Sequence, residues 1–162
     1  MCFIEDSSGA SHDSASACAG WADRRRPLKQ ETVDRVLRLC DALPRGDREL
    51  LEATYRDGKT AVALARLLEK DPRGLRRRIA RLTARVLSPQ YRFVLSHRDS
   101  WAPARRRVAS EIFINGKSAR AAAAALRISL HTARRHQEAV LAMHEAVEAA
   151  RKALSGAKAV GS

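Results

Sequence analysis

The sequence from Asp57 to Ala61 reads DGKTA, and the sequence from Asn115 to Ala119 reads NGKSA. The two stretches are 58 residues apart, and the same shift pairs Arg76-Arg77 with Arg134-Arg135. Each stretch places Gly, which tolerates the left-handed conformation of a helix stop, before a hydroxyl residue that can cap the next helix. One register serves both halves, so the sequence predicts an internal tandem repeat.

Apolar residues recur at helical spacing around these stretches. In the first half, a helix with one apolar face is predicted from four residues at positions i, i+4, i+7 and i+11, which are Leu75, Ile79, Leu82 and Val86. Asp71-Pro72 supplies a cap before it, with Pro at the first helical position. The buried face of the preceding helix, which starts after Thr60, is expected to hold Ala61, Leu64, Ala65, Leu67 and Leu68.

The predicted organisation has four parts. Residues 1–29 are a leader rich in Ser, Ala, Gly and Asp, which we expect to be disordered because it cannot bury enough apolar area. Residues 30–88 and 89–150 are the two repeats, each a short helix, a support helix, a Gly turn and a helix-turn-helix pair. Residues 151–162 are expected to be a frayed tail. The predicted fold class is therefore all-α, with two tandem helix-turn-helix bundles that lack a wing.

The chain is strongly basic. Its 162 residues include 31 Lys and Arg against 18 Asp and Glu, a formal net charge of +13. The positive electrostatic potential of such a protein attracts a polyanion. Nucleic acid is favoured over a membrane because no apolar stretch of about 18 residues exists. Aromatic residues make up only 4% of the chain, too few for the stacking platforms of single-strand binders, so double-stranded DNA is the predicted partner.

The sequence indicates neither an enzyme nor a bound cofactor or metal. Cys2, Cys18 and Cys40 have spacings that match no metal-ligand pattern, so we interpret them as reduced thiols. His136 and His144 lie eight residues apart without further ligands, and we expect them to pack rather than bind metal. No nucleophile elbow or Cys-His arrangement stands out. The N-terminal residues do not follow the pattern of a secretory signal, so we expect a cytoplasmic protein.

Both repeats resemble region four of bacterial RNA polymerase sigma factors and the related LuxR-type output domain. In the second repeat, Gly116–Ala123 leads to Leu126-Arg127-Ile128-Ser129 and then to His131–His136. In the first, Gly58-Lys59-Thr60 and Leu75–Ile79 follow the same pattern. The resemblance covers about residues 43–87 and 103–141. It departs from the family at two turn positions usually held by Gly, which are Glu69 and Arg127.

The resemblance implies duplex DNA binding, with RNA polymerase as a further partner. In a helix-turn-helix, the first helix crosses the phosphate backbone and the second lies in the major groove. The helical period points Arg73 and Arg77 outward, with Arg76 and Arg81 on the flanks. The second repeat, with Ala133, Val140 and Val147 inward, has an equivalent outer face. The predicted DNA contacts are Lys59, Arg73, Arg76, Arg77, Arg81, Lys117, His131, Thr132, Arg134 and Arg135.

Taken together, these features predict a sequence-specific, double-stranded DNA-binding transcription regulator of the nucleoid. Two alternatives stay open. One is an adaptor that binds RNA polymerase or a regulatory protein through its helix-turn-helix units. The other is the DNA-binding component of a mobile-element or phage system.

Overall fold

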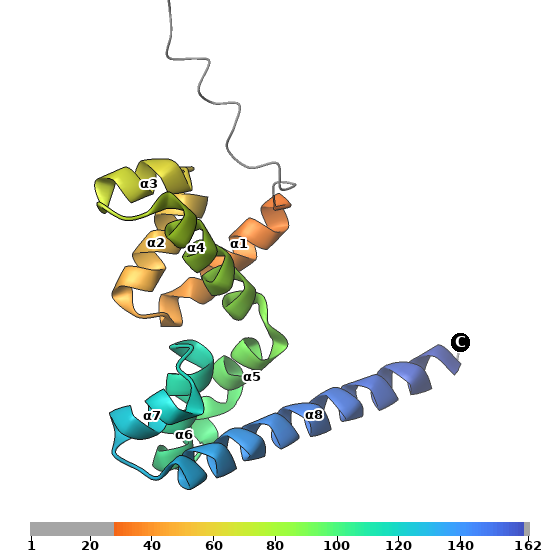
Figure 1. Ribbon diagram of the computed structural model, residues 1–162. Coiled ribbons are helices and arrows are strands. Elements are labelled where there is room, and N and C mark those ends of the chain that lie inside the picture. The colour runs from red at the N-terminus through yellow and green to blue at the C-terminus, as the bar shows by residue number, and fades with distance from the viewer. Residues whose placement is uncertain (1–27, 161–162) are drawn as a thin grey trace, which may run out of the picture.

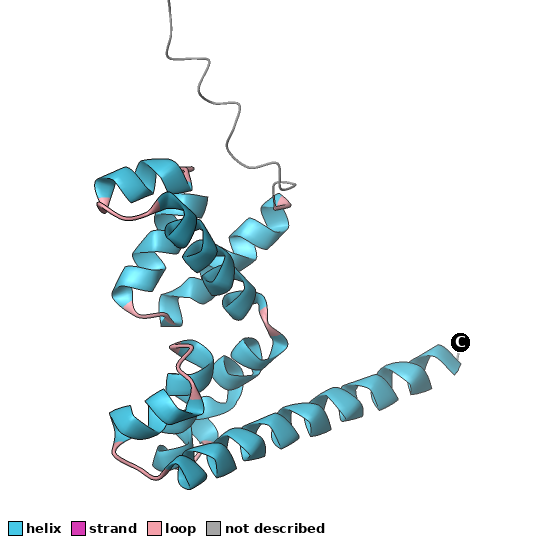
Figure 2. Ribbon diagram, in the orientation of Figure 1, coloured by secondary structure: helices cyan, strands magenta, loops and turns pink. Residues whose placement is uncertain are grey.

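The computed structural model describes residues 28–160, and it describes side chains as far as residue 155. All regular structure in this part of the chain is helical, which confirms the predicted all-α class (Figure 2). Almost all of the predicted disordered leader, residues 1–27, lies outside the described residues. In chain order the elements are α1 (Gln30–Leu39), the 3-10 turn η2 (Cys40–Ala42), α2 (Arg45–Tyr55), α3 (Ala61–Leu67), α4 (Pro72–Leu87), α5 (Pro89–His97), the 3-10 turn η3 (Arg98–Ser100), α6 (Pro103–Ala109), the π-helical turn η4 (Ser110–Ile114), α7 (Ala119–Leu126) and α8 (Leu130–Val160).

The backbone repeats in the register that the sequence predicts. The turns η2 and η3, the starts of α3 and α7, and the starts of α4 and α8 are each 58 residues apart. Gly58 and Gly116 have φ angles of 66° and 68°, and Glu69 and Arg127 have φ angles of 51° and 53°. Helices and turns therefore recur together, with one half at each end of the molecule (Figure 1).

Side-chain caps fix where the helices of each half begin. Thr60 accepts a hydrogen bond from the backbone N–H of Ala63 at 3.2 Å, and Ser118 accepts one from Ala121 at the same distance. Asp71 caps α4 through the N–H of Gly74, as predicted. Such a cap satisfies an amide that the helix itself leaves without a partner. Hence the start of each of these helices is determined locally by the sequence.

Glu69 and Arg127 occupy a left-handed backbone conformation that costs a residue with a Cβ about 1–2 kcal/mol. Arg127 ends α7, and its side chain is exposed. We therefore expect Arg127→Gly to raise the free energy of unfolding by about 1 kcal/mol, measured by urea denaturation. Ala124→Gly, at an exposed position further inside the same helix, should instead lower it by about 1 kcal/mol. A lower stability for Arg127→Gly would contradict this reading of the turn.

A single hydrophobic core runs through both halves. The predicted stripe of α4 is buried throughout: Leu75, Ile79, Leu82 and Val86 are each less than 9% exposed. Helix α5 joins the halves, because its Tyr91 is fully buried and donates a hydrogen bond to the carbonyl oxygen of Leu39 at 2.9 Å. Arg85 of α4 donates to the carbonyl oxygen of Ile114 at 3.0 Å, across the junction. The two repeats are therefore packed against each other.

The buried phenol of Tyr91 makes stability sensitive to alkaline pH. Burial, reinforced by the neighbouring Cys40, raises the pKa of Tyr91 from 10.0 to about 12. Between the pKa of Tyr91 in the unfolded chain and its higher pKa in the folded protein, the unfolded chain loses the phenol proton more readily. The free energy of unfolding therefore falls as pH rises through this range. The free energy of unfolding should fall by about 2–3 kcal/mol between pH 10 and pH 12 because of this group. Urea denaturation of Tyr91→Phe should show a shallower fall, and an equal fall in both proteins would contradict the assignment.

Two apolar residues predicted to be buried are exposed. Leu67 and Leu68 have 70% and 49% of their surface accessible, whereas Leu64 and Ala65 on the same helix are buried. The reason is that α3 ends at Leu67, so these two residues lie at the start of the turn to α4. A helix of seven residues has only two turns, and one buried pair already fills its contact with the core.

The end of the chain also differs from the prediction. Residues 151–160, predicted to fray, continue α8 as helix to Val160. Ala, Lys, Arg and Leu make up seven of these ten residues, and all of them have high helix propensity. Val147, predicted to face inward, is 44% exposed because α8 has by then passed the elements that it packs against.

Candidate nucleic-acid interface

The outer face of α4 carries a group of exposed arginines. Burial of the Leu75 to Val86 stripe turns this face to solvent, and it holds Arg73, Arg76, Arg77 and Arg81, all exposed as predicted. Among the described residues, no carboxylate oxygen lies within 4.0 Å of their guanidinium groups. Arg78 on the same helix differs, because it points toward α2 and forms an ion pair with Asp47 at 2.6 Å. The exposed face therefore keeps its positive charge uncompensated.

The first turns of α8 present a second basic group. His131, Arg134 and Arg135 are exposed, and the described residues place no carboxylate within 4.0 Å of Arg134 or Arg135. The predicted contact Thr132 is different, because its hydroxyl shares a 2.8 Å hydrogen bond with the hydroxyl of Ser129. Ser129 also accepts from the Thr132 backbone N–H at 3.0 Å. Thr132 therefore belongs to the cap of α8.

The two predicted lysine contacts are already engaged within the protein. Lys59 forms an ion pair with Asp57 at 3.5 Å, and Lys117 forms one with Glu111 at 2.7 Å. The hydrogen bond from Lys117 holds the pKa of Glu111 below its usual range. The backbone N–H groups of both lysines donate to carbonyl oxygens of Ala53 and Glu111, each at 3.0 Å. The side chains and the backbone amides of both lysines therefore have partners inside the protein.

Arg81 faces a groove at the junction of the two halves. The groove has a volume of about 670 Å³, and Arg78, Arg81 and Arg85 of α4 line it opposite Phe113 and Gly116. Arg85 reaches across it so closely that a Cβ on Gly116 would lie 2.3 Å from the guanidinium. Arg81 is thus placed between the two halves, and Arg73 and Arg77 remain the central residues of the outer face.

Further exposed basic residues lie on the helices that precede α4 and α8. Arg66 on α3 is exposed, as are Arg120 on α7 and Arg127 in the turn before α8. They are not among the predicted contacts, because outward-facing arginines were predicted only for the second helix of each pair. The available signal was their place on the first helix, which crosses the phosphate backbone in a helix-turn-helix.

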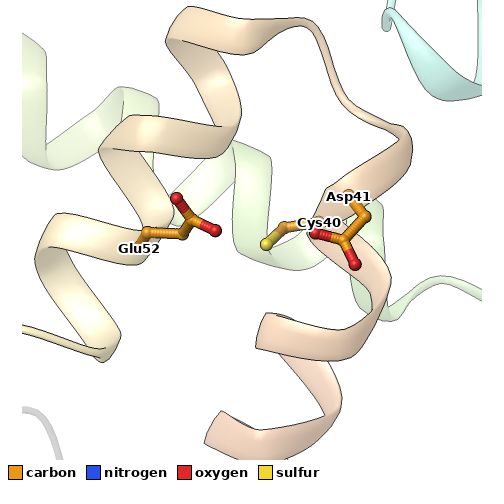
Figure 3. Close-up of side chains that lie close together, drawn as sticks. All are labelled: Cys40, Asp41 and Glu52. Atoms are coloured by element: carbon orange, nitrogen blue, oxygen red, sulfur yellow. The ribbon is translucent and has the colours of Figure 1, made fainter.

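Cys40 lies beside two carboxylates that the sequence did not bring together. Its sulfur and carboxylate oxygens of Asp41 and Glu52 lie within 4.8 Å of one another (Figure 3). Burial raises the pKa of the Cys40 thiol, and the negative charges of Asp41 and Glu52 raise it further. The thiol hydrogen is directed to the carbonyl oxygen of Leu37 at 3.1 Å. This environment therefore favours the neutral, protonated thiol over the thiolate that a metal ligand requires.

His144 has the packing role that we expected. It is 9% exposed, and its ring meets Phe93 edge-on with the centroids 5.2 Å apart. Phe93 also stacks on His97, at 4.4 Å, and on Trp101, at 5.9 Å. This aromatic cluster fixes α8 on α5 and so positions the exposed side chains of the first turns of α8.

Comparison with known proteins gives no relative for this chain. No family model, no curated protein and no solved structure matches it. In the part of the chain that the structure describes, no helix combines the length and apolar character needed to cross a membrane.

Proposed function

We propose that this protein is a sequence-specific regulator of transcription that binds double-stranded DNA through α4 and α8. The observation that carries the proposal is the pair of exposed, uncompensated arginine groups on α4 and α8 at the same position of a repeated fold. The nucleoid is then where we expect the protein to act.

The arrangement of the helices supports this function. Helices α3 and α4 pack together and are joined by residues 68–71, and α7 and α8 pack together and are joined by residues 127–129. In each pair a short helix precedes a longer one (Figure 1). A helix-turn-helix has its helices in this order, and in it the first helix rests on phosphates and the second enters the major groove.

The chemistry of arginine supports it as well. A guanidinium presents five donors in a planar fork, which matches both a phosphate and the O6/N7 edge of guanine. Arg73 and Arg77 are one helical turn apart, as are residues 131 and 135 on α8. Phosphate contacts then supply affinity, and contacts with base edges supply sequence preference.

A second candidate function rests on Leu67 and Leu68. Their exposure beside the start of α4 suits contact with a protein such as RNA polymerase or another regulator. Under this candidate, Leu67→Ser with Leu68→Ser abolishes the protein contact and leaves duplex affinity unchanged.

The test of the proposed function is selection of bound duplexes from a pool of random sequences by the full chain. Two recognition helices on one face of a duplex must be about 10 base pairs apart or a multiple of that. We expect enriched sequences with two half-sites at such a spacing. Recovery of the unselected pool composition would contradict sequence-specific binding.

A further inference from the structure

Helix α8 extends well beyond the body of the protein. Its residues 130–144 include Ala133, Val140 and His144, which are buried against the second half. The projecting segment, residues 145–160, then continues away from all other helices (Figure 1). These 16 residues span about 24 Å. An isolated helix of this length is only marginally stable in water, so a packing partner would stabilise it.

The projecting segment continues an apolar stripe that is buried elsewhere. Ala133, Val140, Val147 and Leu154 follow one another at a spacing of seven residues. The first two are 0% and 1% exposed, whereas Val147 and Leu154 are 44% and 74% exposed. A seven-residue apolar repeat is the pattern by which helices pair along a seam. The rest of the chain therefore covers this stripe at Ala133 and Val140 and leaves it uncovered at Val147 and Leu154.

The charges of the segment indicate what fills the open seam. Between residues 145 and 155 the two acidic residues, Glu145 and Glu148, precede the two basic ones, Arg151 and Lys152. With Lys158 included, the whole projecting segment has a formal charge of +1 in a protein of net charge +13, so it contributes little to the attraction of a polyanion. At about 100° per residue, Glu148 and Arg151 lie on the same flank of the Val147 and Leu154 stripe, where an exposed ion pair of 3.9 Å joins them within the helix.

We propose that the projecting segment pairs in antiparallel orientation with the same segment of a second copy of this chain. In an antiparallel pair the same flanks of both helices meet, so Glu148 of each copy faces Arg151 of the other. Val147 and Leu154 of each copy cover the stripe of the other, and Ala150 allows close approach. Elsewhere the strongly basic copies repel each other, which confines the contact to this segment of low net charge.

The first test measures self-association of the full chain by sedimentation equilibrium without DNA, so that its result is independent of the proposed function. Leu154→Asp should weaken the dimer at least about tenfold, since it removes a buried leucine from each side of the seam. Ala149→Asp, which adds the same charge on the opposite face of the helix, is the matched control and should leave the dimer intact. A monomeric wild-type chain at concentrations up to about 1 mM, or equal effects of both variants, overturns the proposal.

The second test concerns orientation. Glu148→Arg should weaken the dimer about 3- to 10-fold, because it sets like charges opposite each other twice. Mixing Glu148→Arg with Arg151→Glu should restore association as a heterodimer, because each arginine of one copy then faces a glutamate of the other, while the two charges within each helix stay alike. Failure of the mixture to associate overturns the antiparallel arrangement. Circular dichroism of each variant shows that the helix content is unchanged.

Discussion

Replacing Arg73 and Arg77 together by Ala lowers the affinity for duplex DNA at least about 30-fold. Each arginine that contacts a phosphate or a guanine edge contributes about 1–3 kcal/mol, and the two are on the centre of the outer face of α4. Both side chains are exposed. The melting temperature should therefore stay nearly constant, because no buried contact is removed. Fluorescence anisotropy of a labelled duplex measures the affinity.

The matched control for this prediction removes two arginines from another surface. Arg35 and Arg38 on α1 are exposed, and their replacement by Ala lowers the net charge by the same two units. The control should weaken binding only slightly, through the long-range field. Equal losses for both pairs would mean that net charge alone drives binding and that α4 does not dock. A loss of sequence preference would assign the arginines to base edges, and a uniform loss would assign them to phosphates.

Replacing Arg134 and Arg135 by Ala has its largest effect on a duplex long enough for both halves of the protein. When both units bind one duplex, each raises the effective concentration of the other, which can increase affinity by about 10²–10⁴. On a duplex too short for both units, this contribution is absent and the loss should be smaller. Titrations of wild type and variant against the two lengths measure the difference.

The outcomes of this comparison separate three arrangements of the molecule. A larger loss on the longer duplex means that the two halves bind together, as the shared register of α4 and α8 indicates. Equal losses would show that the halves bind independently. No loss on either duplex would make the second half a structural or protein-binding module, which contradicts the proposed role of α8.

The sequence predicted the starts of the helices well because local interactions determine them. Thr60, Asp71 and Ser118 cap helices through hydrogen bonds to amides three residues further on. Gly58 and Gly116 adopt the positive φ that only Gly adopts without cost. The stripe on α4 was predicted for the same reason, since its period is a property of the helix alone.

The ends of helices and the partners of exposed charges were harder to predict. Leu67 and Leu68 continue the apolar pattern of α3, yet the helix ends before it can bury them. Lys59 and Lys117 are predicted DNA contacts, and the sequence pattern did not indicate that each forms an ion pair with a neighbouring carboxylate. The end of α3 and the ion pairs of the two lysines depend on how α2, η4 and their turns are placed in the tertiary structure. The spacing of apolar residues in the sequence does not predict this placement.

The candidate interface was predicted in part. Its outward arginines on α4 follow from the helical period, and their exposure agrees with it. The position of Arg81 at the groove between the halves does not follow from the helical period, because it depends on the packing of α4 against η4. Likewise, the meeting of Cys40 with Glu52 arises from the contact between η2 and α2, which brings together residues far apart in the pattern.

The most direct measurement of the central claim is the salt dependence of duplex binding by the full chain. Log affinity falls linearly with log salt concentration, with a slope of about −0.9 for each phosphate that the protein neutralises. The uncompensated arginines of the interface are Arg73, Arg76, Arg77, Arg81, Arg134 and Arg135. If all of them contact phosphates the slope is about −5, and it is shallower by about 1 for each that contacts a base edge instead. Absence of binding at low salt, or a slope near zero, would contradict the account.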